Sequence, residues 1–150
     1  MTIISRSVLI FRIGQLGDTI VALPAIWAVR KHFPEARLTL LSDQHPGKPY
    51  VRAADIFEGT DMFCGFEAYP VPQSVPGRLL GPFHFAVLLA RLRAQRFDTL
   101  VYLAPSSRSR RQVKRDRGFF AAAGIKQFIG MVFLAAPPTA AWTDPAGPHP

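Results

Sequence analysis

A short apolar run that ends in two closely spaced glycines is the feature that most constrains the fold of this chain. Residues 8–13 (Val-Leu-Ile-Phe-Arg-Ile) contain no glycine or proline, and the sequence Gly14-Gln-Leu-Gly17-Asp18 follows directly. This pattern predicts a buried strand, a tight turn and a helix with Asp18 in its first turn. Glycine lets the backbone bend sharply and lie close to a neighbour. The turn is therefore a candidate binding position at the carboxyl end of the strand.

The segment after this turn completes a predicted βαβ unit. Residues 18–33 have helical periodicity with Pro24 inside, so we expect a helix that is kinked or divided at the proline. Residues 37–41 are the expected second strand, and the two strands should be parallel with a right-handed crossover. The helix should be well buried, because apolar residues surround most of it: Ile20, Val21, Leu23, Ile26, Trp27 and Val29.

The rest of the chain continues the alternation less regularly. Tyr50 to Phe57 predicts a short helix, and residues 67–82, rich in proline and glycine, predict an irregular surface loop. The Pro-rich residues 137–150 are expected to be a linker or tail, so that residues 1–136 form one α/β domain. The remaining expected elements are a helix over 83–95, a strand over 99–103, a helix over 108–123 capped by Gly124 and a strand over 127–130.

The composition limits the partners that the chain can have. Eighteen Lys and Arg against ten Asp and Glu give a formal net charge of +8, which favours nucleic acid, an acidic membrane surface or a phosphorylated substrate. The single cysteine, Cys64, excludes an internal disulfide and fits a reducing cytoplasm; we expect it to be partly buried. Without a signal-peptide pattern or a run of ~20 apolar residues, any membrane contact should be peripheral.

Asp18 has two compatible interpretations. A carboxylate in the first turn of a helix commonly stabilises that helix. A carboxylate at a strand end can also act as a general base toward a substrate hydroxyl. The Gly14-x-x-Gly17 spacing matches neither the dinucleotide fingerprint nor the P-loop, so nicotinamide and nucleoside-triphosphate chemistry are not expected. The histidines and Cys64 show no metal-ligand spacing, so no metal site is predicted.

A dense basic run lies on the helix expected over 108–123. It is either a solvated helix face or an anion-binding face, with Ser106, Ser107 and Arg108 nearest the strand end. Nucleic-acid binding is the weaker alternative, because no aromatic residues are interleaved with the cations. The run consists of Arg108, Arg110, Arg111, Lys114, Arg115 and Arg117.

Four stretches together resemble glycosyltransferase family 9, the lipopolysaccharide heptosyltransferases and their relatives. The opening VLIFRIGQLGDTIVALPA (8–25) and RKHFPEARLTLL (30–41) carry most of the resemblance, which covers about the first 42 residues. FDTLVYL (97–103) and GIKQFIG (124–130) resemble later landmarks of the same N-terminal domain. Residues 43–82 show no match.

The resemblance implies a Rossmann-like parallel sheet flanked by helices, as the N-terminal half of a GT-B fold. It implies a metal-independent, inverting transfer of a sugar from a nucleotide-sugar donor, typically ADP-heptose, to a lipopolysaccharide or other glycan acceptor. Asp18 matches the family's base, and Gly14 and Gly17 match the glycines of its turn. Basic residues contact acceptor carboxylates and phosphates in the family, and the candidates here are Arg108, Arg110 and Arg111.

The resemblance also says what this chain should lack. Its length is that of the acceptor-binding domain, so the domain that binds the nucleotide sugar is expected to be missing and the chain alone inactive. No cofactor is expected beyond that donor. The expected partner is an anionic glycolipid or glycan at the cytoplasmic face of the inner membrane. The alternative function is a non-catalytic module that binds an anionic glycolipid or a membrane surface.

Overall fold

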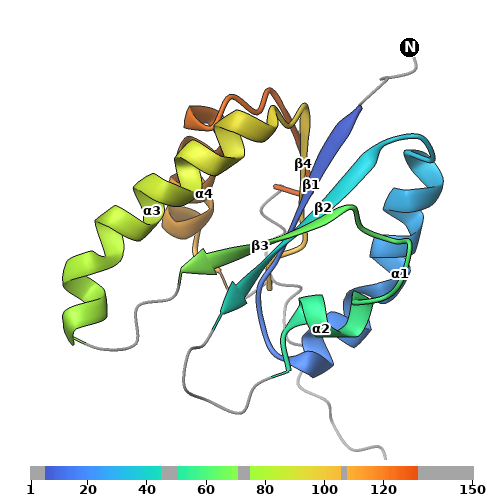
Figure 1. The fold of residues 1–150 in the computed structure, drawn as a ribbon, viewed down its shortest axis with the longest axis horizontal. Coiled ribbons are helices and arrows are strands. Elements are labelled where there is room, and N and C mark those ends of the chain that lie inside the picture. The colour runs from blue at the N-terminus through green and yellow to red at the C-terminus, as the bar shows by residue number, and fades with distance from the viewer. Residues whose placement is uncertain (1–5, 45–50, 71–74, 106–107, 132–150) are drawn as a thin grey trace, which may run out of the picture.

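The computed structural model describes residues 6–44, 51–70, 75–105 and 108–131, which form one alternating α/β unit (Figure 1). Its elements in chain order are β1 (Ser7–Arg12), α1 (Leu16–His32), β2 (Arg37–Gln44), α2 (Ala53–Phe57), β3 (Gly65–Pro70), α3 (Val75–Gln95), β4 (Thr99–Tyr102), α4 (Arg110–Ala122) and β5 (Gln127–Ile129).

The five strands form one sheet in the order β3-β2-β1-β4-β5, and every neighbouring pair is parallel. Figure 1 shows α1 and α2 on one face of the sheet and α3 and α4 on the other. The predicted βαβ unit and the Rossmann-like α/β class are therefore confirmed. From β1 the chain adds β2 and β3 on one side of the sheet and then returns to add β4 and β5 on the other side. The point where the strand order reverses, the switch point, therefore lies between β1 and β4.

The central strand β1 is buried on both faces, which explains its unbroken apolar run. Val8 and Ile10 pack with residues of α1 and α2, whereas Leu9 and Phe11 pack with residues of α3 and α4. All four side chains are fully buried. A parallel strand covered by helices on both sides has no polar face, so its sequence does not alternate.

The irregular loop predicted over residues 67–82 is wrong. Gly65–Pro70 is the edge strand β3, and Val75 already begins α3, which contains Pro82. A proline is tolerated at the end of an edge strand because its missing N–H leaves no ladder bond unmade. Pro76 lies in the first turn of α3, where the N–H groups have no partner within the helix, whereas Pro82 lies further inside and removes one backbone hydrogen bond of the helix.

The expected burial of the first helix is also wrong. α1 continues through Pro24 as one helix, and its buried residues are Thr19 and Ile26. Ile20, Val21 and Trp27 are 52%, 82% and 61% exposed, because α1 contacts the sheet along one side only. Apolar residues around most of a helix predict burial only where neighbours cover each side.

Of the remaining predictions, one is confirmed and one is wrong. Gly124 ends α4 with a φ of 91°, as predicted for a C-terminal glycine. Cys64, expected to be partly buried, is exposed. The linker or tail predicted over residues 137–150 lies outside the described residues. No helix in the described ranges is both long and apolar enough to cross a membrane.

Candidate functional site

The β1–α1 turn lies at the switch point of the sheet, on its carboxyl edge. In the register of the sheet, Phe11 lies opposite Leu41 of β2 and Tyr102 of β4. The turn therefore follows the central strand at the level where β4 ends, while β2 continues for two more residues beyond the partner of Arg12. Ligands of open α/β sheets bind in the crevice outside this edge.

Gly14 is required by the geometry of this turn. Its φ is +125°, and a Cβ placed there would lie 2.7 Å from Oδ2 of Asp18 and 3.2 Å from Nη2 of Arg12. Its N–H donates to Oδ1 of Asp43 at 3.2 Å. Asp43 is buried near the end of β2, two residues beyond the strand predicted over 37–41. Gly14 thus lets the backbone pass close to three polar side chains.

Asp18 joins the turn to the first turn of α1. Its Oδ2 accepts a hydrogen bond from the N–H of Gln15 at 3.1 Å, and Gln15 is the N-cap of the helix. Nη2 of Arg12 lies 3.9 Å from the same oxygen, and the Asp18 side chain is 55% exposed. Asp18 therefore stabilises the helix start and is also open to solvent at the carboxyl edge.

Arg12 is a buried cation that sequence reasoning did not select. Its side chain is 4% exposed. Nη1 donates to the carbonyl oxygens of Ile13 and Leu103, the latter at 3.0 Å, so the guanidinium connects the ends of β1 and β4. A cation as the last residue of an otherwise apolar strand was the available signal. The guanidinium therefore fixes a positive charge beside the side chain of Asp18.

The two glycines of the turn should respond oppositely to alanine. Gly14→Ala places a side chain at positive φ and against Asp18, which should cost ~1–3 kcal/mol for the backbone alone. Gly17→Ala is the matched control, because no atom lies within 4 Å of its Cβ position and the residue is helical. It should be neutral or stabilising by up to about 1 kcal/mol. Urea unfolding followed by circular dichroism measures both, and equal midpoints would contradict the assignment.

A second polar cluster is buried beneath α4. Asp116 is 2% exposed, and its carboxylate accepts hydrogen bonds from the hydroxyl of Tyr102 at 2.7 Å and from Nη2 of Arg108 at 2.5 Å. Arg115 adds a longer contact to Oδ1 at 3.3 Å. The Arg108 guanidinium also lies over the ring of Phe11, 5.9 Å from its centroid. This cluster connects the loop after β4 to the helix that follows it.

Burial changes the acidity of the two tyrosines in this region. The pKa of Tyr102 is raised far above its ordinary value of 10, first by burial and then by its hydrogen bond to Asp116. Burial also raises the pKa of Tyr69, with the charge of Asp116 adding to the effect. Both hydroxyls therefore stay protonated at physiological pH, and the Tyr102 hydroxyl can donate to the carboxylate of Asp116 as observed.

The residues predicted to bind an anion have different environments in the structure. Arg108 is directed to Asp116 rather than to Asp18, and its side chain is 13% exposed. Arg110 and Arg111 are exposed in the first turn of α4. Ser106 and Ser107 lie outside the described residues. The structure thus places Arg108 as an anchor of the loop and leaves Arg110 and Arg111 on the surface beside the carboxyl edge.

Comparison with known proteins gives one informative result. No family model and no curated protein matches this chain. Among solved structures, the crystal structure of the glycosyl transferase family 9 from Veillonella parvula DSM 2008 matches with a TM-score of 0.56 and 13% sequence identity. The match covers 85% of this chain and 36% of that chain. The resemblance seen in the sequence is thus supported by structure, and the chain has the Rossmann-like fold of one part of a family 9 glycosyltransferase structure.

Proposed function

We propose that this chain is the acceptor-binding half of a glycosyltransferase of the heptosyltransferase type, with Asp18 as the general base. The observation that carries the proposal is the position of Asp18 at the carboxyl edge beside the switch point, half exposed and held by Gln15 and Arg12. Among the described residues, both contacts of Asp18 use Oδ2, so Oδ1 is the oxygen that would meet an acceptor hydroxyl.

The chemistry assigned to this carboxylate is a single proton transfer. As the acceptor oxygen attacks the anomeric carbon of the nucleotide sugar, Asp18 takes the hydroxyl proton and the nucleotide diphosphate leaves with the bonding electrons. Arg12, whose Nη2 lies 3.9 Å from Oδ2 of Asp18, helps to hold this side chain in position. No metal is needed for these steps on the acceptor side.

The donor would bind outside this chain. The chain corresponds to 36% of the matched glycosyl transferase, and in the resembling family a second domain binds the nucleotide sugar. We therefore expect the isolated 150 residues to show no sugar transfer. Turnover of ADP-heptose by this chain alone would contradict the assignment of the two halves.

The acceptor is proposed to be an anionic glycan, met by Arg110 and Arg111. Both are exposed at the start of α4, which follows β4 as α1 follows its parallel neighbour β1, so they lie on the same edge as Asp18. A carboxylate or phosphate group on the acceptor would complement them, because guanidinium groups bind such anions with two parallel hydrogen bonds. Ser106 and Ser107, which precede them in sequence, stay candidates for the same role.

Binding of a lipid-free acceptor tests this proposal. The probe is a deacylated lipopolysaccharide inner-core oligosaccharide, titrated by calorimetry at fixed ionic strength. We expect saturable binding that the double variant Arg110→Gln/Arg111→Gln weakens. Glu35→Gln, in the exposed turn between α1 and β2, serves as a control that should bind normally.

The alternative function predicts a different result for the oligosaccharide and for anionic vesicles. A non-catalytic module for anionic membrane surfaces is favoured by the exposed cations of α4, which include Lys114 and Arg115. Such a module would bind anionic vesicles in a salt-sensitive way and would ignore the lipid-free oligosaccharide. Binding to vesicles alone would therefore replace the glycosyltransferase proposal.

A further inference from the structure

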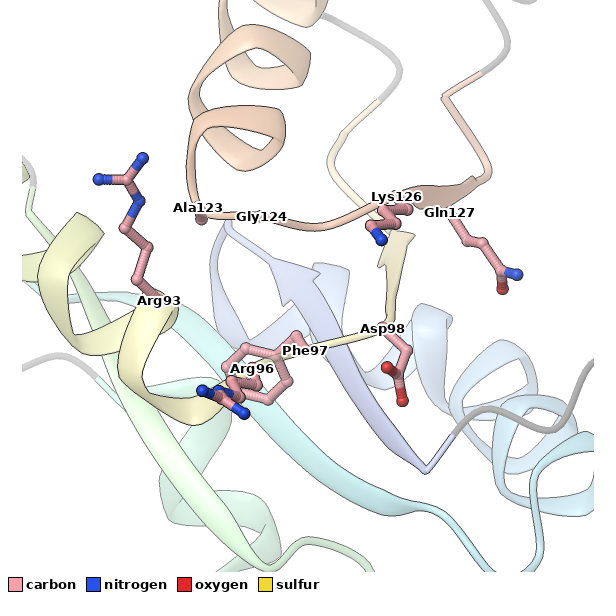
Figure 2. Close-up of a pocket in the computed structure, with 8 residues that line it drawn as sticks. All are labelled: Arg93, Arg96, Phe97, Asp98, Ala123, Gly124, Lys126 and Gln127. Atoms are coloured by element: carbon pink, nitrogen blue, oxygen red, sulfur yellow. The ribbon is translucent and has the colours of Figure 1, made fainter.

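A positively charged hollow lies on the amino edge of the sheet, opposite to the edge that carries Asp18. It has a volume of about 450 Å³ and is lined by Arg93, Arg96, Phe97, Asp98, Ala123, Gly124, Lys126 and Gln127. Figure 2 shows Arg93 and Arg96 at the end of α3 on one side, with Lys126 across from them before β5. The proposed glycosyl transfer uses none of these residues.

The hydrogen bonds of the polar lining leave its cations facing solvent. Arg93 donates its Nε to the carbonyl of Ala122 at 2.8 Å, which uses one of its five N–H groups. Oδ2 of Asp98 accepts the backbone N–H groups of Arg6 and Ser7 at 2.9 and 3.1 Å, so this carboxylate stabilises the start of β1. Arg93, Arg96 and Lys126 are all exposed.

The hollow has a net positive charge even when the nearby negative charges are included. α3 and α4 both end here, and a helix C-terminus carries about half a negative charge. These two ends and Asp98 together offset about two of the three side-chain cations. Cations near helix ends usually only neutralise the helix dipole, but here about one positive charge remains for a ligand.

The backbone of Arg96 supplies an independent observation. Arg96 has a φ of 51° and is the non-glycine residue with positive φ in the described ranges. Gly124 holds the same place after α4, with a φ of 91°. Glycine takes this conformation without strain, whereas an arginine there costs free energy. A strained residue at the rim of a hollow points to a use for its side chain.

We infer that this hollow binds a phosphoryl group, of a soluble phosphate ester or of a lipid headgroup, between Arg96, Arg93 and Lys126. Arg93 and Arg96 come from the end of α3 and Lys126 from the segment before β5, so the cations of the hollow belong to two different segments. Phe97 and the backbone of Ala123 and Gly124 close the floor, where the lower dielectric strengthens the attraction. The inference stands independently of the proposed transferase activity.

Titration with sodium pyrophosphate at constant ionic strength tests the site, followed by ¹H–¹⁵N spectra of the whole chain. We expect saturable shifts at the amides of Arg96, Gly124 and Lys126. Arg96→Gly should weaken binding about tenfold or more, because a charged hydrogen-bond donor is lost. The same variant should unfold at an equal or higher urea concentration, since glycine suits the backbone there.

The matched control is Arg91→Gln, which removes an exposed cation of α3 outside the hollow. An equal loss of binding in Arg91→Gln and Arg96→Gly would show a general charge effect and overturn the site. Co-sedimentation with phosphatidylcholine vesicles, with and without phosphatidic acid, separates the two sources of phosphate. Binding to phosphatidic acid vesicles that Arg96→Gly abolishes would assign a lipid headgroup; binding to neither probe would overturn the inference.

Discussion

Asp18→Asn should lower sugar transfer by ~10²–10⁴-fold in an assembly that includes a nucleotide-sugar-binding domain, because a positioned general base contributes about that factor. The amide has nearly the same shape and its oxygen can still accept the N–H of Gln15, so the helix cap stays in place. Only the capacity to take a proton is lost. The rate constant at saturating donor and acceptor, measured by product formation, is the quantity that should fall.

The chain offers a close control for this substitution. Asp55 has the same position in α2 that Asp18 has in α1: it accepts the N–H of the N-cap residue, Arg52, at 2.8 Å. Asp55→Asn therefore removes the same charge from an equivalent helix start. It should leave transfer unchanged. Similar activity in the Asp18→Asn and Asp55→Asn variants would mean that Asp18 is a capping residue and no more.

The part of the fold around β1 could be predicted because local and tertiary signals agree there. The run from Val8 to Phe11 is apolar on both faces, and the glycine turn follows at once, so strand, turn and helix are each indicated by several residues. The prediction of a loop over residues 67–82 was wrong because prolines were interpreted as breaks in regular structure. Whether a proline is compatible with a strand depends on whether the strand lies at a sheet edge, which is decided by distant pairings.

In the candidate site, too, residues with local partners could be predicted and residues with distant partners could not. Asp18 and Gly14 were found from the sequence because their roles depend on residues within one turn. Arg12 and Asp43 were missed because their partners, Leu103 and Gly14, come from other segments of the chain. Arg108 was selected for its charge, but the structure pairs it with Asp116 eight residues later. Charge alone does not tell a cation that binds a ligand from one that holds the protein together.

Asp116→Ala should be among the most destabilising substitutions in this chain. Removing one member of a buried ion pair costs ~3–5 kcal/mol, because the other charge stays buried without a partner. Here Arg108 would lose its counterion, while its buried Nε already has no hydrogen-bond partner among the described residues, and the Tyr102 hydroxyl would lose its acceptor. Typical domains are stable by only ~5–15 kcal/mol, so the loss should be plain in urea unfolding.

Two further variants decide whether the pairing with Arg108 causes that loss. Asp61→Ala removes an exposed carboxylate and should change stability by less than ~0.5 kcal/mol. Replacing both partners, as in Asp116→Leu/Arg108→Met, should recover much of the stability, since an apolar pair carries no desolvation cost. A double variant no more stable than Asp116→Ala would locate the effect in Tyr102 instead. Because Arg108 anchors the start of α4 through Asp116, Asp116→Ala should also weaken any acceptor binding by Arg110 and Arg111. The double variant, which lacks Arg108, should recover stability without recovering this binding.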